Sequence, residues 1–267
     1  MKGRKGGLSV KLRRVLALVL ALLLALSLGG CAAPADAAVL CSAEAAPAGR
    51  AMAEAGAGLS YAVAEDDAAA LQQLTSGQCE FALVTESGAQ TWQEAGGAAS
   101  PEAVLAVFAV LSRAGDYGAW DRNTRVVIVG EAGGFGDSLA QQVLTCALYG
   151  SVRYDDLDAA LSALERGTAD AVLGMIAPQD EGVSRALGRV RNLELLSMPE
   201  SLIAVRVPDE AVREHALELD GQTAQTYALF GALCTGGAVS TEQEEAAYRA
   251  AQEAGILSVG APGAILE

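Results

Sequence analysis

The feature that most constrains the fold is a regular alternation of short apolar runs and helical patterns, separated by glycines. Near the start of the body these segments are, in chain order, residues 38–42, 47–55, 59–64, 66–77 and 81–84. Asp66 or Asp67 can cap the second helical segment, and Gly77 is suited to end it. Strand, helix, strand, helix, strand in this order predicts a parallel sheet covered by helices.

The same alternation returns later in the chain, which predicts a second α/β lobe. Its segments are residues 125–129, 139–149, 157–167, 169–176 and 193–196. The apolar strands 104–111 and 226–234 cross between the lobes, and residues 241–254 form a closing helix. We therefore expect an α/β protein with lobe 1 at 38–117 and 222–267 and lobe 2 at 118–221. Two strands joining two lobes form a hinge around a central cleft.

The first thirty residues have the pattern of an export signal rather than of a fold element. Six basic residues precede the first acidic one, and an apolar run from Val15 to Leu26 follows them. This run is shorter than the roughly 20 apolar residues of a spanning helix. Leu28-Gly29-Gly30-Cys31 resembles a bacterial lipobox, which implies a lipoprotein signal peptide at 1–30, lipidation of Cys31 and a tether at 31–37. An ordinary signal peptide or an uncleaved anchor is the alternative; each places the body outside the cytoplasm, and lipidation places it on the extracytoplasmic face of the cell membrane.

Charge and cysteine usage exclude several partners. The chain has 18 basic and 33 acidic residues, and beyond residue 30 the balance falls to 12 against 33, a net charge of −21. Nucleic-acid binding needs clustered Lys and Arg, so we expect no nucleic-acid partner. Cys41, Cys79, Cys146 and Cys234 have no CxxC spacing and none lies near His215, so we expect no metal site and buried free thiols.

Three segments resemble type 2 periplasmic solute-binding proteins. They are residues 74–96 (LTSGQCEFALVTESGAQTWQEAG), 125–138 (RVVIVGEAGGFGDS) and 161–172 (LSALERGTADAV). The nearest likeness is to the TAXI-type receptors of TRAP transporters, through Trp92 to Gly96 and Gln222 to Cys234. The resemblance implies the two-lobed type 2 fold and a receptor that delivers a small organic solute to a TRAP-type permease. The substrate-binding lipoprotein of an ABC importer, and a sensor or interaction lipoprotein without transport, are the alternatives.

Loops at the carboxyl ends of parallel strands face a crevice, where helix N-termini suit anions or carboxylates. These loops predict the following ligand-binding residues: Ser42, Thr85, Glu86, Ser87, Gly133, Gly134, Phe135, Gly136, Ser138 and Met175. In the alternative interpretation, Asp137 and Ser138 only cap a helix. Glu86, Glu131 and Asp137 would repel a dianion unless Arg113 turned inward. A small organic acid, amino acid or zwitterion therefore fits better than phosphate or sulfate.

Enzyme classes fit the sequence less well. The run from Gly134 to Leu139 follows a strand like a dinucleotide fingerprint, but Leu139 stands where a small residue is expected. There is no G-x-S-x-G elbow, and His215 is the one histidine available as a general base. The acidic stretch 210–219 around it is typical of a helix with an exposed histidine. We therefore expect no enzymatic activity and no cofactor.

Overall fold

The computed structural model describes residues 37–130, 132–199 and 212–258. The strands are β1 (Ala37–Cys41), β2 (Leu59–Val63), β3 (Phe81–Thr85), β4 (Ala98–Ala99), β5 (Ala103–Ser112), β6 (Arg125–Val129), β7 (Ser151–Asp155), β8 (Ala171–Ile176), β9 (Glu194–Leu195), β10 (Val212–Leu219) and β11 (Gln222–Thr235). The helices are α2 (Ala46–Ala55), α3 (Asp67–Ser76), α4 (Glu86–Glu94), the 3-10 helix η1 (Tyr117–Ala119), α5 (Phe135–Thr145), α6 (Leu157–Glu165), α7 (Glu181–Arg189) and α9 (Thr241–Glu253). No helix within these ranges is long and apolar enough to cross a membrane.

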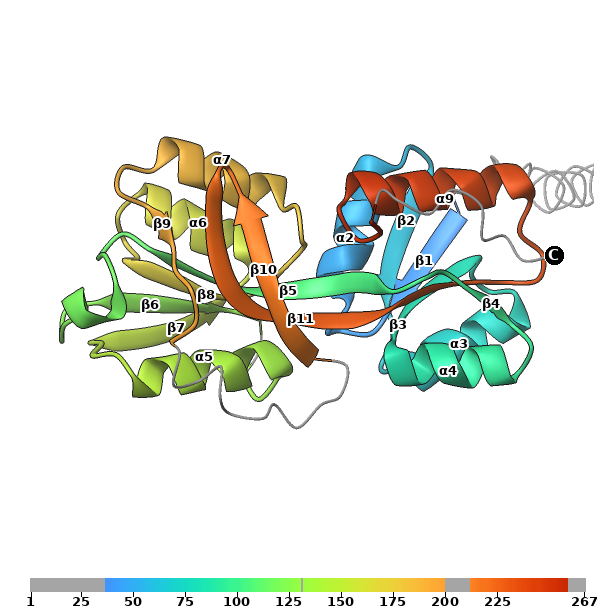
Figure 1. The fold of residues 1–267 in the computed structure, drawn as a ribbon, viewed down its shortest axis with the longest axis horizontal. Helices are drawn as coiled ribbons and strands as arrows, with labels where there is room; N and C mark the ends of the chain where they lie inside the picture. The colour runs from blue at the N-terminus through green and yellow to red at the C-terminus, as the bar shows by residue number, and fades with distance from the viewer. Residues whose placement is uncertain (1–36, 131, 200–211, 259–267) are drawn as a thin grey trace, which may run out of the picture. The chain divides into compact units, whose positions relative to one another are not determined.

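The sheet has two parallel groups joined by antiparallel strands, in the order β2-β1-β3-β11-β5-β8-β6-β7. In the first group β1 is parallel to β2 and β3; in the second, β6 is parallel to β7 and β8. Between them β11 is antiparallel to β3 and β5, and β5 is antiparallel to β8. Figure 1 shows β5 and β11 side by side, running from one group to the other. This confirms the α/β class and the two lobes joined by two crossing strands.

The crossing strand β5 is deeply buried in the sheet. In β5 nine of ten residues are buried, as expected for a strand covered on both faces. Phe108 on β5 and Phe81 on β3 are fully buried and belong to one hydrophobic cluster. That cluster also takes in residues of both parallel groups, including Val39 and Ile128. The hinge strands are therefore part of the core and not a loose connection between two independent domains.

The prediction of a helix over residues 210–219 is wrong for residues 212–219, the part that the structure describes. Residues 212–219 form β10, which pairs antiparallel with β11 through the turn Asp220-Gly221. Both turn residues have positive φ, 48° and 75°, as the favoured two-residue hairpin turns with two left-handed positions require. Leu217 and Leu219 are buried on alternate positions of this strand. His215 is consequently half-buried on a strand rather than exposed on a helix.

The structure also differs from the predictions at several helix boundaries and in the burial of one cysteine. Thr85 is the N-cap of α4, so the expected loop 85–87 runs into a helix. The helix expected from residue 139 begins at Phe135 and ends at Thr145. Cys41, Cys79 and Cys234 are buried free thiols, and burial raises the pKa of Cys41 to about 12. The expectation of a buried thiol is wrong for Cys146, which is exposed.

Some predictions fall outside the described residues. These are the signal segment 1–30, the lipidation site Cys31 and the tether up to residue 36, together with Glu131 and residues 259–267. The two lobe boundaries near residues 117 and 221 stay a prediction.

Candidate functional site

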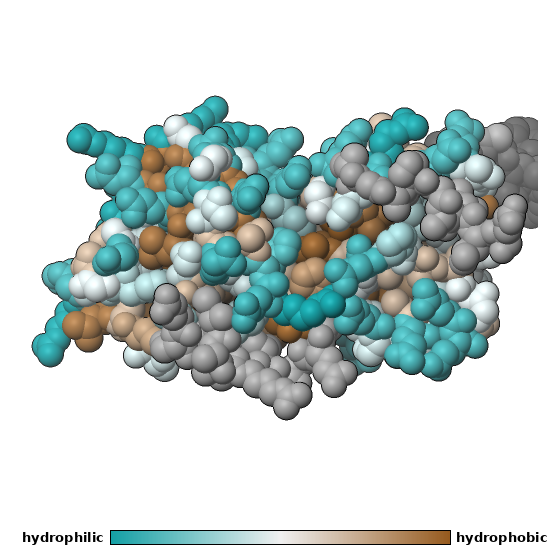
Figure 2. Space-filling view, in the orientation of Figure 1, coloured by the Kyte–Doolittle hydropathy of each residue, from teal (hydrophilic) through white to brown (hydrophobic). Residues whose placement is uncertain are grey.

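A cavity of about 770 Å3 lies between residues of the two parallel groups. One wall comes from α2 and from Tyr61 and Val63 on β2. The other wall comes from the loop after β6, the start of α6 and the loop after β8, and the end of α9 contributes Glu253 and Ala254. Figure 2 shows a mostly hydrophilic face with apolar patches near the middle of the view. The volume is in the range of small-molecule sites in proteins.

Four helices begin at this cavity. The first residues of α2, α5, α6 and α7, or their N-caps, belong to its lining. Asp156 and Asp180 cap α6 and α7 by accepting from the N–H groups of Ala159, at 2.7 Å, and Val183, at 2.9 Å. Among the described residues, no side chain caps α2 or α5. At α2 the Ala46 N–H donates to the Ala43 carbonyl at 3.4 Å and Pro47 has no N–H, so it is the uncapped start of α5 that gives the cavity a position of positive partial charge.

The side chains around the cavity are strongly acidic. Seven carboxylates line it: Glu44, Glu54, Asp137, Asp156, Asp180, Glu181 and Glu253. Arg50 is the one basic side chain of the lining within the described residues, and its guanidinium contacts Glu54 at 2.8 Å and Asp158 on α6 at 2.9 Å. Burial raises the pKa of the Asp180 carboxyl. The hydrogen bond from the Gly133 N–H holds the pKa of Asp137 below its usual value.

Five predicted residues line the cavity: Gly133, Gly134, Phe135, Gly136 and Met175. A Cβ at residue 136 would lie 3.1 Å from the Cγ of Met175, a tight contact that the Met175 side chain would have to relieve by a small shift. The start of α5 therefore packs closely on β8. These residues come from neighbouring strands β6 and β8, whose carboxyl ends meet at one edge of the sheet.

Two predicted serines lie beside the cavity lining without being part of it. Ser42 follows β1 and is buried, and its hydroxyl has no hydrogen-bond partner among the described residues. Ser138 is exposed on the first turn of α5, where its hydroxyl donates to the Gly134 carbonyl at 3.2 Å. Both neighbour lining residues, Ala43 for the first and Asp137 for the second.

The predicted residues Thr85, Glu86 and Ser87 form a separate group outside the cavity lining. The Thr85 N–H and hydroxyl both donate to Oδ2 of Asp67, at 2.9 and 2.5 Å. The hydroxyls of Thr85 and Ser87 are 3.0 Å apart. Glu86 accepts from the Arg213 guanidinium at 2.6 Å. These contacts occupy the polar groups that were expected to face a ligand.

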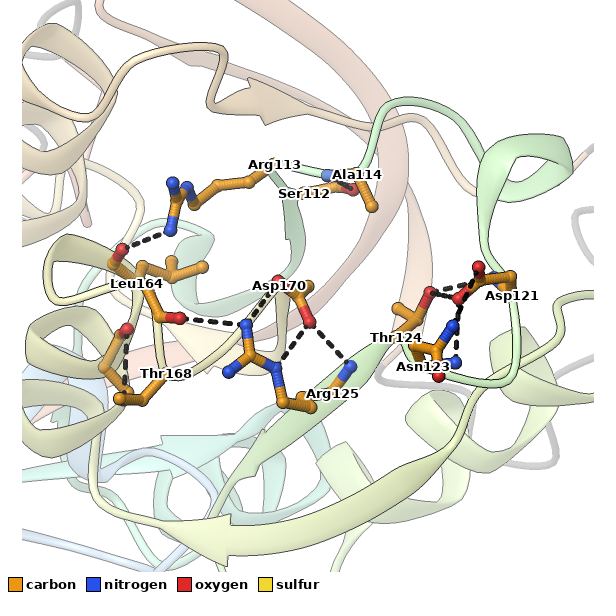
Figure 3. A network of polar contacts seen from close by, with 12 residues as sticks. Ser112, Arg113, Ala114, Asp121, Asn123, Thr124, Arg125, Leu164, Thr168 and Asp170 are labelled. Carbon is orange, nitrogen blue, oxygen red and sulfur yellow. Dashed lines mark hydrogen bonds and ion pairs between the residues drawn. The ribbon is translucent and has the colours of Figure 1, made fainter.

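Arg113 does not turn into the cavity. Its Nη1 donates to the carbonyl of Leu164, at the end of α6, at 3.0 Å, as Figure 3 shows. Beside it in the same figure, Arg125 holds Asp170 with a 2.8 Å ion pair. The basic residue at the cavity is instead Arg50.

Sequence reasoning missed Arg50 and Tyr61, as well as the acidic lining of α7 and α9. Tyr61 is 42% exposed although it stands in a strand. The position of Arg50 in the helix that follows the first strand was a usable signal, since such helices begin at the crevice. No local pattern distinguishes Glu253 or Glu181 from the other acidic residues of the chain.

No protein-family model matches the chain, and no curated protein matches it either. Three solved structures with some similarity to this chain are the following. The second substrate-binding domain of a putative amino acid ABC transporter from Streptococcus pneumoniae has a TM-score of 0.37 and 12% identity, over 81% of this chain and 92% of that one. A Salmonella typhimurium periplasmic binding protein of high arginine specificity has a TM-score of 0.36 and 14% identity, over 82% of this chain and 93% of that one.

Full-length LTTR LysG from Corynebacterium glutamicum with bound effector Arg gives a TM-score of 0.47 and 15% identity, over 92% of this chain and 76% of that one. All three TM-scores are below 0.5. These likenesses therefore identify neither a ligand nor a partner, and the fold class rests on the sheet order described above.

Proposed function

We propose that this chain is an extracytoplasmic solute-binding receptor that captures a small organic molecule in its cavity and delivers it to a membrane permease. The cavity carries this proposal, because its lining comes from both parallel groups and stands where helices begin. Contacts from both sides form only when the two lobes close on a ligand. Binding then favours the closed form that a permease recognises.

The resemblance to TAXI-type receptors supports a TRAP-type permease as the partner, and an ABC importer is the alternative. The lipobox-like segment supports an anchor at Cys31 on the extracytoplasmic face. The strongly acidic body repels anionic headgroups, so the acyl chain would have to hold the protein at the membrane. A Cys31→Ser variant should move from the membrane fraction to the soluble fraction; continued membrane association would contradict the anchor.

Thermal unfolding with candidate solutes tests the proposal. The full chain in detergent would be heated with amino acids, amines, organic acids and sugars. A ligand at 100 times its dissociation constant adds about 2.7 kcal/mol to the free energy of unfolding, which raises Tm visibly. A panel that leaves Tm unchanged would contradict solute binding.

A pair of tyrosine variants connects a positive result to the cavity. Tyr61→Ala removes a 42% exposed side chain from the cavity wall and should weaken binding of the ligand. Tyr149→Ala removes a tyrosine of similar exposure, 40%, that does not line the cavity, and should leave binding unchanged. Equal binding by both variants would place the ligand elsewhere.

A further inference from the structure

We propose that the solute is a small organic cation, with an ammonium or guanidinium group on an apolar body. This inference deepens the proposed function and rests on it, because it concerns the same cavity. It follows from three observations: the charge of the lining, the state of its one basic side chain and the aromatic residues in its walls.

Carboxylates are concentrated at the cavity beyond the general acidity of the chain. Of the 26 described residues that line it, seven are acidic, against 33 of 267 residues in the whole sequence. They come from separate elements, with Glu54 on α2, Asp156 at α6, Asp180 at α7 and Glu253 on α9. Carboxylates that line one cavity from four elements attract a cation and repel an anion.

The single guanidinium that the described residues place in the lining does not offset this charge. Arg50 is held between Glu54, at 2.8 Å, and Asp158, at 2.9 Å, so two carboxylates share its positive charge. An anionic ligand would have to compete with both for the same guanidinium. Arg50 therefore does not neutralise the other lining carboxylates, of which Glu181 lies 4.0 Å from the Arg185 guanidinium outside the lining.

Aromatic and apolar side chains complete the site. Tyr61 and Val63 are exposed large hydrophobic residues on β2, and both line the cavity. Phe135 lines it from the opposite wall, at the start of α5. Aromatic faces attract ammonium and guanidinium groups, and Val63 can cover an alkyl chain. Exposed aromatic surface beside carboxylates suits a cation with an apolar body better than a hydrophilic anion.

Two sources could supply such a cation, a basic amino acid or an amine without a carboxylate. The uncapped start of α5 can hold an α-carboxylate, whereas an amine needs only the acidic and aromatic walls. Matched pairs separate them: lysine against cadaverine, and arginine against agmatine. Glutarate and glutamate serve as anionic ligands of similar length.

Calorimetric titration of the full chain in detergent with these six compounds tests the inference. We expect at least one cation to bind and both anions to fail, and we expect affinity to fall as salt is raised. Binding of glutarate or glutamate with no binding of any cation would overturn the inference and leave the receptor function standing. If none of the six compounds binds and no solute of the wider panel changes Tm, both the inference of a cationic ligand and the proposed receptor function are contradicted.

Charge-neutralising variants tie the result to the lining. The double variant Glu181→Gln/Glu253→Gln removes two exposed carboxylates from the cavity and should weaken cation binding about fivefold or more. Glu245→Gln changes an exposed carboxylate on the same helix, α9, that does not line the cavity, and should leave affinity unchanged. Equal affinities for the double variant and this control would overturn the assignment of the cation to these carboxylates.

Discussion

His215 on β10 lies outside the cavity lining and packs against an aromatic ring. Its ring meets Phe230 edge-on, with 6.0 Å between centroids, and the Arg213 guanidinium lies 4.1 Å from the centre of the same Phe230 ring. Arg213 in turn pairs with Glu86 and Glu102, each at 2.6 Å. Burial lowers the pKa of His215 below 6.5. Burial therefore favours the neutral form of this histidine in the folded protein.

The lowered pKa of His215 makes stability depend on pH. As pH falls below 6.5, the unfolded chain takes up this proton before the folded chain does, so the folded state loses stability until its own lower pKa is reached. His215→Gln removes this loss. The free energy of unfolding of the variant, relative to that of the native chain, should be higher at pH 5 than at pH 8. Urea denaturation at both pH values measures this difference. A difference that is the same at both pH values would contradict the buried neutral histidine.

At the scale of elements, helix ends are defined by local hydrogen bonds. Asp66 caps α3 by accepting from the Ala69 N–H at 2.7 Å. Ser240 and Gln243 form a reciprocal capping box at the start of α9. Gly77 ends α3 in the left-handed conformation, with φ of 72°. These interactions involve residues within four positions of one another, which is why residue types alone signalled the ends of α3.

Gly77→Ala tests the backbone requirement at the end of α3. A Cβ at Gly77 meets nothing within 4 Å, so only the left-handed φ opposes the alanine, at a cost of about 1 kcal/mol. Gly237→Ala is the matched control, since its Cβ also meets nothing within 4 Å and its φ is not positive. We expect urea denaturation to show a loss for the first and none for the second. Equal effects would contradict this explanation.

At the scale of the whole described body, two kinds of contact join the parallel groups. The covalent connection runs through β5 and β11, which are buried in a shared core. The second contact is the Arg50–Asp158 ion pair between α2 and α6, whose side chains are 40% and 70% exposed. Exposed pairs contribute little to stability. The core strands therefore hold the fold together, and the ion pair sits where the lobes meet across the cavity.

A double-mutant cycle on Arg50→Ala and Asp158→Ala measures this contact. Because both side chains are exposed, we expect a coupling of at most about 1 kcal/mol in the free energy of unfolding, and less at high salt. The control cycle pairs Arg50→Ala with Glu165→Ala, on the same helix α6, and should show no coupling. A coupling of several kcal/mol would contradict the minor role that exposure gives this ion pair.

The sequence by itself determined most elements and their order, because strand and helix periodicity and caps are short-range. It did not reveal β10, since its acidic residues favoured a helix and the signal lay in the Asp220-Gly221 turn, whose two positive φ angles build a hairpin. For the cavity it placed the loop from Gly133 to Gly136 and Met175, which stand at the ends of adjacent parallel strands.

Only the tertiary structure decided which parts of the first lobe face those loops. Thr85, Glu86 and Ser87 also follow a parallel strand, yet their polar groups bind Asp67 and Arg213, while Arg50 and Tyr61 line the cavity. The choice depends on how β5 and β11 orient the two groups of strands. That orientation arises from packing between residues more than one hundred positions apart, such as Thr226, whose hydroxyl donates to the Phe108 carbonyl at 2.5 Å. A local pattern carries no information about contacts at that distance along the chain.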